Sequence, residues 1–211
     1  MTLPLWLSLL AACLVISLTP GAGAINTMSN ALAQGWRRSI WGILGQQLAL
    51  VAHVVIVAAG VGLLVAGSPL LFGAIRYLGA AYLVFLGIRL MLIRTDAAEE
   101  GEEPTHIPES AWSMLRRGFW VNLLNPKAIV FFLAFMPQFI RVDQPQLPQY
   151  AVFLATTVCV DIAVMWGVFA AAARTFRRLT RTPRGRRTLN TVFGGLFIGV
   201  AALLVFVHWA G

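Results

Sequence analysis

Six stretches of this chain are long and apolar enough to cross a lipid bilayer as helices. Hydrocarbon is about 30 Å thick and a helix rises about 1.5 Å per residue, so a span needs roughly 20 mostly apolar residues. Only 11% of the 211 residues are charged, far below the share in a soluble domain. We therefore predict an all-α membrane protein of six transmembrane helices, at residues 3–25, 39–66, 69–93, 118–140, 148–173 and 191–209.

The first stretch ends in Ala22-Gly23-Ala24, a run of small residues that resembles the cleavage site of a secretory signal. No Lys or Arg precedes the stretch, and it is longer than the apolar core of a signal peptide. We expect it to remain as the first span.

Positive charge is distributed unequally between the predicted loops. Twelve of the 16 Lys and Arg residues lie in the first, third and fifth loops, and seven of these are the arginines from Arg174 to Arg187. Lys and Arg are retained on the cytoplasmic side of a membrane. We therefore predict both termini outside (N-out/C-out) in a multi-pass protein of the bacterial inner membrane, and we attribute the net charge of +8 to this orientation and not to a nucleic-acid partner.

A charged segment divides the chain into two halves of three spans each. We predict a single transporter domain over residues 1–211, with one half at 1–93, an acidic cytoplasmic linker at 94–117 and the other half at 118–211. The acidic residues of this linker are Asp96, Glu99, Glu100, Glu102, Glu103 and Glu109. Because three is an odd number, the second half enters the membrane in the opposite orientation, which permits two inverted three-helix repeats.

The first span of each half contains a helix breaker. Thr19-Pro20-Gly21 interrupts the first span, and Asn125-Pro126 interrupts the fourth. Proline lacks a backbone N–H and clashes with the preceding turn, which leaves polar backbone groups free at membrane depth. Paired interruptions in corresponding helices indicate the binding site of a transporter. The alternative is a pair of packing kinks with no part in binding.

Three ionisable residues lie well inside the predicted spans. Asp161 is the only carboxylate within any span, and a charge there is costly to bury, so we expect it to be functional. His53, on the same helix face as Gln46, either relays protons or bonds a neighbouring carbonyl as a neutral ring. Lys127 either snorkels toward the cytoplasm or meets Asp161 or a substrate carboxylate.

Small residues recur where helices can approach each other closely. Gly73, Ala80 and Gly87 lie seven apart on the third span, and Gly195 and Gly199 form a GxxxG motif in the sixth. We expect these to be packing surfaces, with a homodimer face as the alternative for the GxxxG motif.

Other classes of protein find little support in the sequence. The two cysteines lie inside apolar spans, and three scattered histidines without a carboxylate cluster do not make a metal site. No GxSxG or HExxH motif favours an intramembrane hydrolase. We expect a protein that is not an enzyme and that needs no metal or other cofactor.

Six segments together carry a family resemblance. They are SLTPGAGAINTM (17–28), YLGAAYLVFLGI (77–88), FWVNLLNPKAIVFF (119–132), MPQFI (136–140), QPQLPQY (144–150) and VDIAVM (160–165). In this order they resemble the LysE/RhtB family of amino-acid exporters across both halves of the chain. Many members read Pro-Gly-Pro where this chain has Pro20-Gly21-Ala22, a departure that is similar to the homoserine-type branch and makes lysine or arginine export less expected.

The resemblance implies export of a small amino acid in exchange for protons. It implies homoserine, homoserine lactone or threonine as substrate; the alternatives are another neutral amino acid such as leucine, a passive pore or a membrane interaction protein. An amino-acid carboxylate suits the N-terminus of a half-helix, and its ammonium suits carbonyls or an acid. We expect substrate binding by Thr19, Pro20, Gly21, Gly23, Asn26, Asn125, Pro126 and Lys127, and proton coupling by Asp161 and His53.

Overall fold

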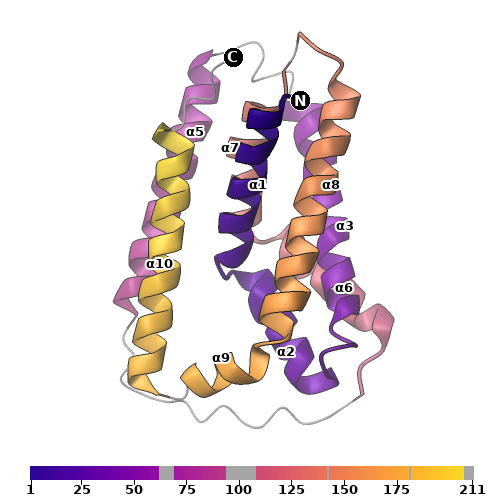
Figure 1. Ribbon diagram of the computed structural model, residues 1–211, viewed down its shortest axis with the longest axis vertical. Helices are drawn as coiled ribbons and strands as arrows, with labels where there is room; N and C mark the ends of the chain where they lie inside the picture. The colour runs from indigo at the N-terminus through magenta and orange to yellow at the C-terminus, as the bar shows by residue number, and fades with distance from the viewer. Residues whose placement is uncertain (62–68, 94–107, 142, 181, 207–211) are drawn as a thin grey trace.

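The structure, a computed structural model, describes residues 1–61, 69–93, 108–141, 143–180 and 182–206. Within these ranges its elements are helices, most of them aligned with the long axis of one bundle (Figure 1). In chain order they are α1 (Leu3–Leu18), α2 (Ala22–Gln34), α3 (Ile40–Ile56), η1 (Val57–Val61), α5 (Pro69–Leu92), α6 (Ala111–Leu123), α7 (Pro126–Phe135), η2 (Met136–Phe139), α8 (Gln146–Val164), η3 (Met165–Ala170), α9 (Ala173–Thr180) and α10 (Pro183–Phe206).

Several of the described helices can cross a membrane. Four are long and apolar enough by themselves: Ile40–Gly60, Gly73–Leu92, Gln146–Ala170 and Pro183–Val205. Two bent pairs meet the same criterion only when their members are taken together, because each member is too short alone. These pairs are α1 with α2, bent by 58°, and α6 with the segment Pro126–Phe139, bent by 57°. The described residues therefore contain four candidate spans, or up to six if each bent pair is one span.

The structure confirms both predicted breaks. α1 ends at Leu18 and α2 begins at Ala22, with Pro20 between them. α6 ends at Leu123, and Pro126 is the first residue of α7, where its fixed φ angle fits the helix and its missing N–H costs nothing. The side chain of Asn125 caps α7 by accepting a hydrogen bond of 3.1 Å from the Lys127 backbone N–H.

Two helices begin earlier than the apolar pattern indicates. α6 begins at Ala111, so residues 111–117 of the predicted linker are helical, and α10 begins at Pro183 and not at residue 191. Apolar residues mark only the part of a helix that lies in hydrocarbon, whereas the helix itself continues for as long as its backbone hydrogen bonds do. Three predicted features lie outside the described residues. They are the acidic residues at 96–103, residues 62–66 of the second predicted span and residues 207–209 of the sixth.

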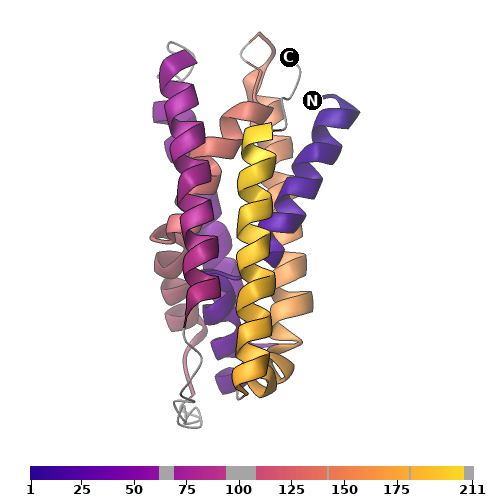
Figure 2. The same cartoon turned by 90° about the vertical axis from the view of Figure 1, so that its left-hand side faces the viewer.

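Glycines allow two helix pairs to cross closely. A Cβ atom added to Gly118 of α6 would overlap the Gly42 carbonyl oxygen of α3. In the second pair, a Cβ atom on Gly87 of α5 would lie 2.7 Å from the Gly194 carbonyl oxygen of α10. Figure 2 shows α5 and α10 running alongside each other for most of their length. Gly199 of the GxxxG motif has no described atom within 4 Å of where its Cβ would lie, so this part of α10 is open.

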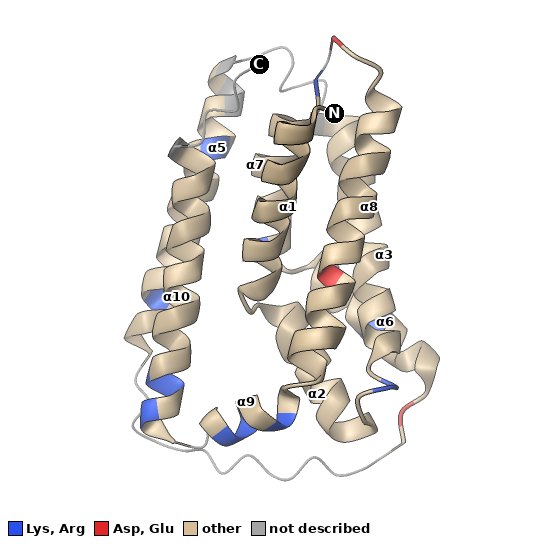
Figure 3. Ribbon diagram, viewed as in Figure 1, with Lys and Arg blue, Asp and Glu red and all other residues tan. Residues whose placement is uncertain are grey.

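Charged side chains gather at one end of the bundle. α9 lies across this end, and arginines of α9 and of the first turns of α10 gather there (Figure 3). Four of them are exposed, Arg174, Arg178, Arg184 and Arg187, and two are half-buried, Arg177 and Arg186. At the same end, Trp36 and Trp166 stack with their ring centroids 4.6 Å apart. Each indole N–H donates to the backbone carbonyl of the other tryptophan, at 3.0 and 3.2 Å. This pair connects the segment after α2 to η3.

Candidate functional site

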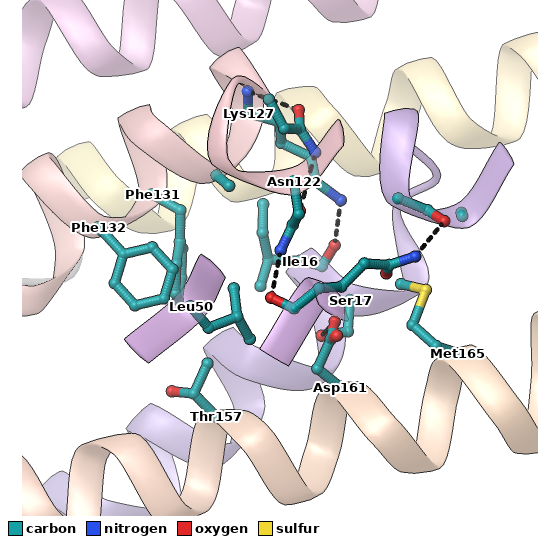
Figure 4. A pocket seen from close by; sticks show the side chains of 15 residues that line it. Ile16, Ser17, Leu50, Asn122, Lys127, Phe131, Phe132, Thr157, Asp161 and Met165 are labelled. Carbon is teal, nitrogen blue, oxygen red and sulfur yellow. Dashed lines mark hydrogen bonds between the residues drawn. The ribbon is translucent and has the colours of Figure 1, made fainter. Parts of the chain in front are cut away.

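The two breaks meet near the middle of the bundle, around a small cavity (Figure 4). Its lining comes from α1, α2, α3, α6, α7, α8 and η3, so both halves of the chain contribute. The cavity has a volume of about 40 Å³, and one water molecule needs roughly 10–15 Å³ on this measure. The cavity therefore has room for a few water molecules and is too small for an amino acid until the surrounding helices separate.

Lys127 connects the second break to the first. It is 9% exposed, and its ammonium donates hydrogen bonds to the carbonyl oxygens of Ile16, at 3.0 Å, and Thr19, at 2.5 Å. These carbonyls belong to the last turn of α1, where backbone acceptors lack partners within the helix and a positive charge is favourable. An ammonium has three N–H groups, so one remains for a ligand.

Asp161 lies on α8 across the cavity from Lys127. Its carboxylate accepts hydrogen bonds from the Ser17 hydroxyl of α1, at 3.1 Å, and from the Gln47 amide of α3, at 2.7 Å. Each oxygen of Asp161 thus accepts from one neutral donor, and each oxygen keeps a lone pair for a further donor. Lys127 and Asp161 thus place opposite charges at one cavity while each is held by other groups.

The N-terminus of α2 forms a third side of the cavity. Gly21 is its N-cap and provides no side-chain partner, so the first N–H groups of the helix have no cap. Gly23 and Ala24 line the cavity, and Gln46 donates to the Gly23 carbonyl, at 3.1 Å, and to the Thr27 hydroxyl, at 3.0 Å. A Cβ atom on Gly23 would lie 3.0 Å from the Gln46 carboxamide oxygen, so a larger residue there would press on this side chain.

His53 lies behind the cavity and does not line it. One ring nitrogen lies 2.9 Å from the Ala49 carbonyl of the preceding turn of α3. Its ring stacks on Phe132, which lines the cavity, with centroids 5.3 Å apart. His53 of the first half thus contacts α7, the helix that follows the break of the second half.

The remaining predicted site residues take different positions. Gly23, Asn125 and Lys127 line the cavity together with Asp161. Thr19 is fully buried and contributes its carbonyl to Lys127, while its hydroxyl donates to the Val15 carbonyl. Gly21 is close to the Lys127 stem, since a Cβ atom there would lie 3.3 Å from Lys127 Cε.

Pro20 and Pro126 shape the two breaks without lining the cavity. Asn26 does not line the cavity either; it is 8% exposed and faces α3.

Sequence reasoning missed several polar residues of the site. Ser17, Asn122 and Thr157 line the cavity, and Gln47 holds Asp161 from outside the lining. The adjacent glutamines Gln46 and Gln47 carried a signal, because two carboxamides in the middle of an apolar stretch need partners in the membrane. Nothing in the sequence marked Ser17 or Thr157 as site residues, because a hydroxyl in a membrane helix can bond the preceding turn of its own helix.

A multi-pass helical membrane protein with opposite charges at a central cavity between two broken helices belongs to the class of membrane transporters. Comparison with known proteins defines the family. The LysE type translocator family matches residues 14–207, and the chain belongs to this family.

Relatives of the chain are membrane and efflux proteins. It is 40% identical over 210 residues to the homoserine/homoserine lactone efflux protein of Salmonella typhimurium, covering 100% of both chains. It is 41% identical over 204 residues to an uncharacterized membrane protein of Vibrio cholerae, covering 97% of this chain and 98% of the other. A leucine efflux protein of Klebsiella pneumoniae is 29% identical over 203 residues, covering 94% and 93%. No solved structure matches the chain significantly.

Proposed function

We propose that this protein exports homoserine and related small neutral amino acids, including homoserine lactone and threonine, across the bacterial inner membrane in exchange for protons. The observation that carries the proposal is the placement of Lys127 and Asp161 at one cavity where both broken spans meet. The 40% identity to the homoserine/homoserine lactone efflux protein supports the choice of substrate.

The cavity has the chemistry that an amino-acid zwitterion requires. The third N–H of Lys127 and the uncapped N-terminus of α2 suit a carboxylate. Asp161 suits the ammonium group, since its oxygens retain lone pairs. Phe131 and Phe132 supply an apolar wall that suits a short side chain. Asn125, with Pro126, fixes the start of α7 and so the position of Lys127.

Proton coupling follows from competition at Asp161. A carboxylate that binds an ammonium group cannot carry a proton at the same time, so the substrate and the proton exclude each other. When Asp161 is ionised it carries the substrate outward, and when it is protonated the empty site returns inward with the proton. The two steps together give antiport. His53 is the second candidate for proton transfer because its ring lies against Phe132, one layer from the cavity.

Substrate passage requires the cavity to widen. The breaks between α1 and α2 and between α6 and α7, each bent by nearly 60°, are the natural hinges, because backbone hydrogen bonding is already interrupted there. We propose that the two halves are inverted three-helix repeats in six spans, with this pair of hinges related by the repeat.

The orientation is part of the proposal. With the arginine-rich end of the bundle in the cytoplasm, the start of α1 and the end of α10 lie on the outer side, so we propose that both termini are outside. A C-terminal alkaline phosphatase fusion should be active and a green fluorescent protein fusion dark, and the reverse result would overturn both the orientation and the repeat.

The experiment that tests the function is a substrate panel in inside-out vesicles, with and without an imposed pH gradient. A coupled exporter accumulates homoserine when the gradient is present. The second candidate is export of another neutral amino acid such as leucine, which the 29% identity to a leucine efflux protein favours. Accumulation of leucine without homoserine would select that candidate, equilibration without a gradient would indicate a passive pore, and no uptake at all would contradict transport of these compounds.

A further inference from the structure

Polar side chains continue from the cavity along α2 toward the arginine-rich end. Asn26 and Asn30 lie one turn apart on α2, and Asn26 follows the cavity residue Gly23 by a further turn. From Gly23 to Asn30 the helix rises by about 10 Å. Asn30 is fully buried and Asn26 is 8% exposed.

The amide nitrogens of these two asparagines have no hydrogen-bond partner in the described part of the chain. Both lie against Gly42 of α3, where a Cβ atom would be 3.4 Å from Asn26 Nδ2 and would overlap Asn30 Nδ2. A buried N–H without a partner costs roughly 1–3 kcal/mol, so these two amides, both facing Gly42 of α3, are free to donate to a ligand.

Beyond Asn30, an arginine is held by a carboxylate at the bundle end. The Arg117 guanidinium of α6 donates to Asn30 Oδ1 and forms an ion pair of 2.8 Å with Glu109. The Arg117 side chain is 45% exposed and that of Glu109 is 22% exposed, so water reaches both. Glu109 is fixed in turn by Ser113, at 2.7 Å.

We infer that Arg117, with the amides of Asn30 and Asn26 behind it, is a cytoplasmic capture site for the carboxylate of the substrate. Glu109 pairs with the Arg117 guanidinium when no substrate is bound. The carboxylate of an amino acid has the same chemistry as the Glu109 side chain and replaces it there. The two unpartnered amides of Asn30 and Asn26 then donate hydrogen bonds to the carboxylate in turn, on its way to the cavity at Gly23. The inference rests on the proposed function, since it assumes an amino acid that moves from the cytoplasm to the cavity.

One consequence separates this role from a structural one. Homoserine has a free carboxylate, whereas homoserine lactone has none, because its carboxyl group is closed into an ester. A guanidinium that captures carboxylates therefore assists homoserine and is indifferent to the lactone. A residue that only holds the helices together affects both compounds equally.

The test measures initial uptake into inside-out vesicles, whose outer face is the proposed cytoplasmic face, as a function of homoserine or lactone concentration. Arg117→Gln should raise KM for homoserine by about tenfold or more, the loss expected for a charge-assisted hydrogen bond, and leave KM for the lactone unchanged. Arg116→Gln is the matched control, because it removes the same charge from the neighbouring exposed position, and it should change neither value. Equal changes for both compounds in Arg117→Gln, or no change for homoserine, would overturn the inference.

Glu109→Gln tests the same competition in the opposite direction. It keeps the size of the side chain while weakening its hold on Arg117, so KM for homoserine should fall. An unchanged or higher homoserine KM in this variant contradicts the inference even if Arg117→Gln fails to fold. Wild-type vesicles that take up neither compound would show instead that the proposed function is wrong.

Discussion

The Lys127 ammonium donates a hydrogen bond of 2.5 Å to the Thr19 carbonyl, which joins two residues that are 108 positions apart in the chain. Each belongs to a break in a membrane helix, so this contact ties the two breaks to each other. It also places the ammonium at the C-terminal end of α1, where carbonyl groups without helical partners favour a cation. The contact thus holds the end of α1 against the start of α7.

Replacement of Lys127 by methionine removes the charge and keeps an unbranched side chain. Homoserine export should fall by about ten- to one hundredfold, because charge-assisted hydrogen bonds to a ligand contribute about 1.5–3 kcal/mol. Lys127→Arg keeps the cation and should retain more export than Lys127→Met. Efflux from cells expressing equal amounts of each variant measures the difference, and wild-type export by Lys127→Met would remove the ammonium from the site.

Asp161→Asn keeps the size and polarity of the side chain but removes its titration. The protein should still fold and exchange substrate, whereas accumulation driven by a pH gradient should disappear. Uptake into inside-out vesicles with and without the gradient measures this, and Cys159→Ser, on the exposed face of the same helix, serves as the control. If Asp161→Asn accumulates homoserine normally, proton coupling must lie elsewhere, with His53 as the next candidate.

Pro126→Ala restores the backbone N–H at the start of α7. The helix should then tend to continue across the break, which displaces Lys127 and lowers transport while expression is maintained. Pro183→Ala is the matched control, because Pro183 also begins a helix but lies far from the cavity along the chain. Transport at the wild-type rate by Pro126→Ala would mean that the break is a packing kink only.

Gly118→Ala should destabilise the protein by about 1–3 kcal/mol, because the added methyl group overlaps the backbone of α3 at Gly42. Gly199→Ala should not destabilise the protein, because the added methyl group would face open space and alanine favours the helix. Thermal unfolding of the two purified variants in the same detergent makes the comparison. A Gly118→Ala variant as stable as Gly199→Ala would contradict the close approach of α3 and α6.

The helical membrane class and the positions of both breaks could be predicted from the sequence because they depend on local chemistry. Hydrocarbon requires long apolar helices wherever polar backbone must be hidden, and proline interrupts a helix wherever it stands inside one. The charge of Asp161 was visible in the same way, as an acid within an apolar stretch.

The partners of the polar groups were decided only by the tertiary structure. The sequence left Lys127 with several roles, including snorkelling, and only the crossing of α1 and α7 brings it to the carbonyls of Ile16 and Thr19. Likewise, only the packing of α3 against α8 brings Gln47 to Asp161. Hydrogen bonds act over about 3 Å, whereas these residues are separated by about a hundred positions or more, so the relative placement of whole helices determines which groups meet.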